Sequence, residues 1–172
     1  MANYISFSQV KNWVKCPHYH KLANIDKVEG AFSGNIYTAF GSALHETIET
    51  HLTNVIDDTQ LKEHFAKSFE KERNLLTESI EDSHYKQFLN QGEKLVDKYK
   101  KTLDSYFGDD YTVVKCEEEI FEEVTEYNGT PFKFRGYIDL VVKVGETYHI
   151  LDWKTCSWGW DAKRRADKMT VY

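Results

Sequence analysis

The sequence predicts an α/β protein of mixed α+β character, in which a β-meander is flanked by α-helices. Apolar residues recur at helical spacing as far as about residue 107, and from Tyr111 onward their period changes to two. Two turn signals, Asn128-Gly129 and Gly145-Glu146, divide this second part into strands. Helices therefore come first, and a three-stranded meander follows them.

The helical part divides into four segments, at residues 6–15, 37–54, 58–75 and 79–107. Ser6 and Ser8 are suitable N-caps for the first helix, and Cys16-Pro17 is expected to end it. Residues 30–36 are expected to form a loop. Gly92 lies inside the fourth segment, where a glycine is expected to bend or weaken a helix.

Three strands are expected, at residues 111–127, 131–144 and 147–155. Residues 158–172 return to helical composition. No repeat or low-complexity stretch divides the chain, and its 172 residues suit a single domain over residues 1–172.

The turn at Gly145-Glu146 determines how the last two strands pair. Glycine suits the first central position of a two-residue turn, so Val144 pairs with Thr147. Counting back along both strands places Asp139 opposite Asp152. Directly opposed residues have Cβ atoms about 4.5–5.5 Å apart, and like charges there repel each other. Apolar neighbours on both strands add a desolvation cost for the two carboxylates.

A divalent cation would remove both costs, because hard cations such as Mg²⁺ bind carboxylates together with substrate phosphates. Strand alternation places Lys154 on the same face as Asp152. Two acids and a lysine on one patch indicate a metal-dependent phosphodiesterase site. The alternative is a solvated hairpin face with scattered charges, and these residues alone favour neither.

The helix at 37–54 carries a stripe of Gly41, His45 and Glu49, each four residues from the next. A glycine inside a helix costs about 1 kcal/mol relative to alanine, so a close approach to a sheet would explain Gly41. Separately, His45 fits a hydrogen-bonded or surface histidine, and Glu49 fits a helix-surface charge. Together they could reach a metal or orient a ligand.

Composition limits the class of protein. The net charge is −6, but basic residues cluster at the two ends of the chain, so DNA binding is permitted without being demonstrated. No apolar run approaches the roughly 18 residues of a membrane span, and the N-terminus lacks the features of a signal peptide. Three widely spaced cysteines argue against a disulfide framework. We therefore expect a cytoplasmic, intracellular protein without a membrane partner.

Four motifs follow one another along the chain. They are the segment from Ser6 to Pro17, GSALHETIE at 41–49, GYIDL at 136–140 and LDWKT at 151–155. In this order they resemble S-x-S-x-x-x-x-x-x-x-C-P, G-x-x-x-H-x-x-x-E, G-x-x-D and D-x-K of RecB-like nucleases, the exonuclease-type branch of the PD-(D/E)xK superfamily. The resemblance covers nearly the whole chain and implies a restriction-endonuclease-like core with a central mixed β-sheet.

The resemblance also implies roles for individual residues. The implied ligands of Mg²⁺ or Mn²⁺ are His45, Asp139, Asp152 and the main-chain carbonyl of Trp153. The implied catalytic residues are Asp139, Asp152, the catalytic lysine Lys154 and the supporting acid Glu49. Glu117, Glu118 and Glu119 fit a solvated strand edge from which one carboxylate could also face the metal.

The chain departs from the family pattern in two places. Family members carry a Gln-x-x-x-Tyr motif and a further strand after the D-x-K strand, whereas this sequence ends at Tyr172. We therefore expect a domain that is incomplete at its C-terminus and completed by a further segment or a protein partner. Cys16 matches the first ligand of an iron–sulfur cluster found in some relatives, but no closely spaced C-terminal cysteine triplet follows, which argues against a cluster.

The function expected from sequence is metal-dependent hydrolysis of DNA phosphodiester bonds, by an exonuclease of recombination, repair or phage DNA processing. Two alternatives stay open. One is a nucleic-acid-binding or partner-binding module that keeps the motifs but is inactive. The other is a nuclease that acts on RNA or on structured junctions.

Overall fold

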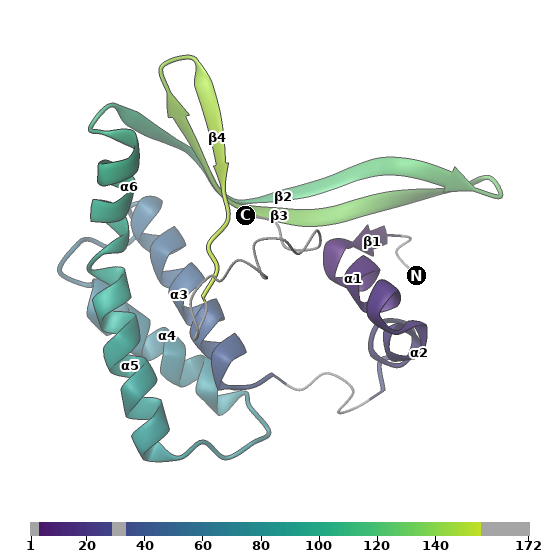
Figure 1. The fold of residues 1–172 in the computed structure, drawn as a ribbon, viewed down its shortest axis with the longest axis horizontal. Coiled ribbons are helices and arrows are strands. Elements are labelled where there is room, and N and C mark those ends of the chain that lie inside the picture. The colour runs from purple at the N-terminus through teal and green to yellow at the C-terminus, as the bar shows by residue number, and fades with distance from the viewer. Residues whose placement is uncertain (1–3, 29–33, 156–172) are drawn as a thin grey trace. The chain divides into compact units, whose positions relative to one another are not determined.

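The computed structural model describes residues 4–28 and 34–155, and its elements follow the predicted order (Figure 1). The helices are α1 (Phe7–Lys15), α2 (Pro17–His20), a π-helical turn at Lys21–Ile25, α3 (Ile36–Leu52), α4 (Leu61–Asn74), α5 (Asp82–Val96) and α6 (Tyr99–Phe107). The strands are β1 (Tyr4–Ser6), β2 (Tyr111–Tyr127), β3 (Thr130–Val144) and β4 (Thr147–Leu151). The helical composition noted at 158–172 and most of the loop expected at 30–36 lie outside the described residues.

The sheet contains both parallel and antiparallel pairs, which confirms the predicted mixed α/β class. β3 lies between β1 and β2, and it also pairs with β4. β1 runs parallel to β3, with Tyr4 opposite Lys133 and Ser6 opposite Arg135, whereas β4 runs antiparallel to β3. The predicted meander of β2, β3 and β4 is present, and β1 is a short strand that the sequence pattern did not indicate.

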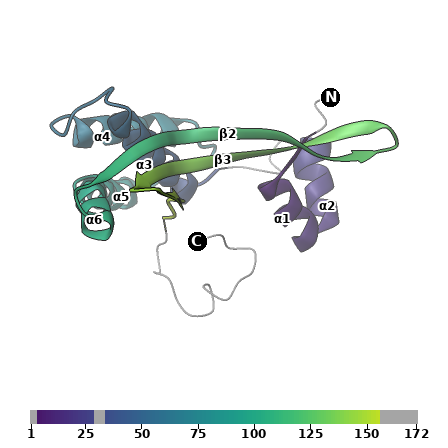
Figure 2. The same ribbon diagram turned by 90° about the horizontal axis from the view of Figure 1, so that it is seen from above.

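The described chain forms two compact units, of which the first comprises residues 4–28 and 117–138. Ser6 caps α1 as predicted, because its hydroxyl accepts a hydrogen bond from the Gln9 N–H at 3.3 Å. The helix ends at Cys16, and Pro17 begins α2, the position where proline's missing N–H costs nothing. Figure 2 shows α1 and α2 side by side.

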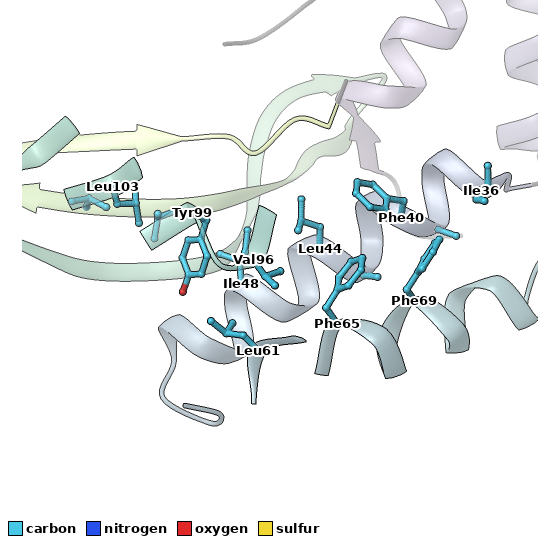
Figure 3. Packing of buried hydrophobic residues seen from close by; sticks show 14 residues of the cluster. Ile36, Phe40, Leu44, Ile48, Leu61, Phe65, Phe69, Val96, Tyr99 and Leu103 are labelled. Carbon is cyan, nitrogen blue, oxygen red and sulfur yellow. The ribbon is translucent and has the colours of Figure 1, made fainter. Parts of the chain in front are cut away.

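The second unit comprises residues 34–116 and 139–155, and its core gathers around α3. Asn35 and Thr38 form a capping box that starts this helix. α3, α4, α5 and α6 form one group in both ribbon views (Figure 1 and Figure 2). Figure 3 shows Phe40 of α3 facing Phe65 and Phe69 of α4, and the rings of these residues are in edge-to-face or stacked contact. Leu140 and Val142 bring β3 into the same core, where both are fully buried.

The helix predicted over residues 79–107 is in fact two helices, α5 and α6, which the chain separates at Asp97 and Lys98. The Lys98 N–H bonds to the Leu95 carbonyl at 3.0 Å, which tightens the last turn of α5. The Asp97 carboxylate pairs with Lys62 of α4 at 2.6 Å. The continuous helical pattern is therefore interrupted at Asp97 and Lys98, and Tyr99 is the first residue of α6.

The helix predicted over 58–75 starts later, at Leu61. The Asp57 carboxylate accepts hydrogen bonds from both the N–H and the hydroxyl of Thr59, so the chain forms a side-chain-supported turn before the helix begins. Hydrogen bonds to the Asp57 side chain thus replace helical hydrogen bonds in this segment, and α4 is shorter than predicted for this reason.

Gly92 lies within α5 without interrupting it, because its role is steric. A Cβ at Gly92 would lie 2.0 Å from Cζ of the fully buried Phe65 ring. The glycine therefore allows α5 to approach α4 closely. At Gly41 of α3 the nearest atom to an added Cβ is the Thr155 hydroxyl at 3.5 Å, an ordinary contact.

We expect Gly92→Ala to lower the free energy of unfolding by about 1–3 kcal/mol, because the fully buried Phe65 ring would have to shift to accommodate the added methyl group. Gly41→Ala is the matched control and should raise stability by about 0.5–1 kcal/mol, the usual gain for alanine inside a helix. Denaturant unfolding of both variants measures the difference. Equal stability of the Gly92→Ala variant and the wild type would show that α4 and α5 do not require this close approach.

Candidate active site

The hairpin between β3 and β4 turns at Gly145-Glu146 as the sequence predicts. Gly145 has a φ of 55°, a left-handed conformation that glycine adopts without strain. Val144 pairs with Thr147, and the ladder continues in register to Leu140 and Leu151. The predicted register is therefore confirmed for all five pairs of this hairpin.

The ladder stops one pair short of Asp139 and Asp152, so the strand predicted over residues 147–155 ends at Leu151. Beyond this point the Trp153 N–H donates to Oδ2 of Asp139 at 2.6 Å. The Asp139 carboxylate of β3 thus accepts the hydrogen bond that a backbone carbonyl would accept in a continuing ladder. The chain consequently leaves the sheet where the D-x-K motif begins.

His45 of α3 reaches the same point. Its Nε2 lies 2.9 Å from the Trp153 carbonyl oxygen, and its Nδ1 lies 3.6 Å from Oδ2 of Asp139. The His45 side chain is 25% exposed and that of Asp139 is 10% exposed, so the cluster is largely shielded from water. The structure therefore brings together three of the predicted ligands, His45, Asp139 and the carbonyl of Trp153.

Asp152 and Lys154 form an ion pair with each other beside this cluster. The Lys154 ammonium also donates to the Trp153 carbonyl at 3.4 Å. The second oxygen of Asp152, Oδ2, is buried and has no hydrogen-bond partner among residues 4–28 and 34–155. A buried carboxylate oxygen left in this state carries a substantial desolvation cost, which a bound cation would relieve.

Glu49 and Glu117 complete the acidic side chains considered from sequence. Glu49 is half-buried on α3, one turn beyond His45, and no group of His45, Asp139 and Glu49 is close enough to share one ion in the described part of the chain. Glu117 follows Cys116 in β2 with a φ of 48°.

The model of the PD-(D/E)XK nuclease superfamily matches the chain over residues 4–172. The protein belongs to this superfamily. Membership confirms the resemblance at the level of the superfamily and agrees with the restriction-endonuclease-like arrangement of a mixed sheet flanked by helices. A comparison with curated proteins gave no match.

Membership in the PD-(D/E)XK superfamily implies a metal-dependent nuclease with nucleic acid as its substrate. The donor set agrees with this chemistry, because carboxylate oxygens and one imidazole suit a divalent cation. The residues present therefore fit a divalent metal ion. Oδ2 of Asp152 has no hydrogen-bond partner among the described residues, and in the same part of the chain no group of His45, Asp139 and Asp152 is close enough to share one ion.

Among the described helices of this superfamily member, none is long and apolar enough to cross a membrane.

Proposed function

We propose that this PD-(D/E)XK protein is a Mg²⁺- or Mn²⁺-dependent deoxyribonuclease that hydrolyses DNA phosphodiester bonds as an exonuclease, in recombination, repair or phage DNA processing. The observation that carries the proposal is the convergence of His45 and Asp139 on the main chain of Trp153, inside the D-x-K motif. The exonuclease assignment is supported by the resemblance of the motifs to those of RecB-like nucleases.

In this proposal His45, Asp139, Asp152 and the carbonyl of Trp153 hold the metal. When bound, a divalent ion lowers the pKa of a coordinated water and polarises the scissile phosphate. Asp139 has a second function, because its Oδ2 accepts the Trp153 N–H and so orients the peptide that carries the carbonyl. His45 contacts the same carbonyl through Nε2, which places the imidazole beside the other donors.

Lys154 supplies positive charge where the phosphate would bind. Its side chain is 48% exposed and pairs with the Asp152 carboxylate, so the ammonium is accessible to an anionic substrate. We propose that the ammonium binds a phosphate oxygen or steadies the attacking water, and that it stabilises the negative charge that develops in the transition state. Glu49, one turn from His45 on α3, is the supporting acid in this scheme.

We expect His45→Ala to weaken Mn²⁺ binding by about 10-fold or more, because the variant loses one ligand of a small site. Titration calorimetry with Mn²⁺ alone measures the effect. His84→Ala is the matched control, since His84 lies on α5 and contacts the Phe88 ring instead. Equal Mn²⁺ affinity in the His45→Ala variant and the wild type would exclude His45 as a ligand.

Lys154→Ala should reduce cleavage by about 10²–10³-fold while leaving Mn²⁺ affinity equal or slightly higher, because a positive charge beside the ion is removed. Asp152→Ala should lose both cleavage and affinity. Lys143→Ala is the control on the same hairpin, where Lys143 pairs with Glu146 at 3.9 Å, and it should cleave normally. Cleavage at the wild-type rate by the Lys154→Ala variant would contradict the catalytic assignment.

A substrate panel separates the proposed exonuclease from the alternatives. End-labelled linear duplex DNA, single-stranded DNA, closed circular DNA, a four-way junction and RNA are each incubated with the full-length protein and Mg²⁺ or Mn²⁺. The proposal expects release of nucleotides from DNA ends and an intact closed circle. Cleavage of RNA or of the junction alone favours the other nuclease class. Binding without cleavage, at metal concentrations that saturate the site, indicates the inactive binding module.

A further inference from the structure

A chain of polar side chains lies beside the candidate active site without belonging to it. Nδ1 of His51 is hydrogen-bonded to the hydroxyl of Tyr99, and Nε2 of the same imidazole lies 2.9 Å from Oδ1 of Asp58. His51 is at the end of α3, Asp58 is in the turn that follows it, and Tyr99 is the first residue of α6. Three segments of the second unit are thus joined by one imidazole.

The direction of these hydrogen bonds follows from the chemistry of the groups. A carboxylate accepts, so Nε2 of His51 carries the hydrogen and donates the hydrogen bond to Asp58, and Nδ1 is left as an acceptor for the Tyr99 hydroxyl. Burial raises the pKa of Tyr99 above its ordinary value, which keeps the hydroxyl protonated and available as a donor. Tyr99 is only 6% exposed, and Figure 3 shows it in the core close to Val96 and Ile48.

Asp58 itself is held by a supported turn. The preceding carboxylate, that of Asp57, accepts the Thr59 N–H at 2.8 Å, and the Asp57 N–H donates to the side chain of Gln60 at 3.0 Å. The Asp58 side chain is 70% exposed, so its pairing with His51 contributes little free energy. Its effect is to select the tautomer and the orientation of the imidazole.

The other end of this chain is in contact with Trp153. The Tyr99 and Trp153 rings are perpendicular, with centroids 6.2 Å apart and an interplanar angle of 87°. Edge-to-face pairs of this kind have a preferred geometry, so an oriented tyrosine ring orients its partner. The main chain of Trp153 carries both the N–H that bonds to Asp139 and the carbonyl that bonds to His45.

We propose that Tyr99 and His51 are positioning residues for the active site, which hold the Trp153 ring and thereby place the Trp153 peptide groups that Asp139 and His45 contact. The proposal deepens the proposed function and rests on it for the role of the Trp153 carbonyl at the metal. It gives a role to a buried tyrosine hydroxyl and a histidine that lie next to a site whose proposed chemistry uses neither.

Tyr99→Phe tests the proposal, because it keeps the ring and removes only the hydroxyl that fixes its orientation. Tyr111→Phe is the matched control: the Tyr111 hydroxyl also donates to a side chain of the same unit, Asp104 at 2.9 Å, but its ring contacts Phe107 and not Trp153. Each variant loses one hydrogen bond made by a tyrosine hydroxyl. The thermal stability of both variants is measured as well, so that an effect on the site is distinguished from general destabilisation.

The first readout is Mn²⁺ affinity, which we expect to fall about 10-fold in Tyr99→Phe and to stay within about twofold in Tyr111→Phe. The second is amide hydrogen exchange of the Trp153 N–H without metal, where we expect about fivefold less protection in Tyr99→Phe than in the control. His51→Ala should behave like Tyr99→Phe. His51→Asn should recover most of the loss, because its amide oxygen can replace Nδ1 as the acceptor.

Unchanged Trp153 exchange in the Tyr99→Phe variant would overturn the positioning role, whatever the metal result. Unchanged Mn²⁺ affinity together with reduced Trp153 protection would also overturn it, since the placement of the peptide would then not matter to the site. A wild-type protein that fails to bind Mn²⁺ would instead contradict the proposed function, and the exchange data would still report separately on the contact between Tyr99 and Trp153.

Discussion

The hydrogen bond from the Trp153 N–H to the Asp139 carboxylate is the interaction on which the candidate site depends. A backbone donor at the end of a strand normally pairs with a neighbouring backbone carbonyl. Here the carboxylate of Asp139 takes that place at 2.6 Å, and the ladder between β3 and β4 ends at Leu140 and Leu151. The end of the β3–β4 ladder and the orientation of the D-x-K segment therefore both follow from this hydrogen bond.

In this arrangement one oxygen of the Asp139 carboxylate makes two contacts. One oxygen is committed to the main chain of Trp153 and also lies near Nδ1 of His45. The same peptide unit presents its carbonyl to Nε2 of His45. An acid, an imidazole and a carbonyl are consequently fixed relative to one another by two contacts, which is the preorganisation that a small metal centre requires.

The helical core supports this geometry from the side of α3. The buried face of α3 packs on Phe65 and Phe69, and the adjacent stripe carries Gly41 and His45 towards the end of β4. Gly92 allows α5 to approach Phe65, and the break after α5 makes Tyr99 the first residue of α6. The close packing of the helices and the position of Trp153 are therefore linked through the contact between the Tyr99 and Trp153 rings.

Local patterns were sufficient for those parts of the protein in which a short segment determines its own conformation. The Gly145-Glu146 turn predicted the register of β3 and β4, and Ser6 predicted the start of α1. The motif order identified the superfamily, because D-x-K and its partners lie in short segments whose chemistry is visible in the residues themselves.

Long-range contacts decided the rest. The ion pair between Asp97 and Lys62 lies beside the break between α5 and α6. The Asp139 carboxylate on β3 accepts the Trp153 N–H where β4 ends at Leu151. β1 forms by pairing with β3, which lies far away in the sequence. The hydrogen bonds from Asp58 through His51 to Tyr99 likewise join residues that are far apart in the sequence. Such contacts have no period and no local signature, because their free energy depends on partners that only the folded chain brings within reach.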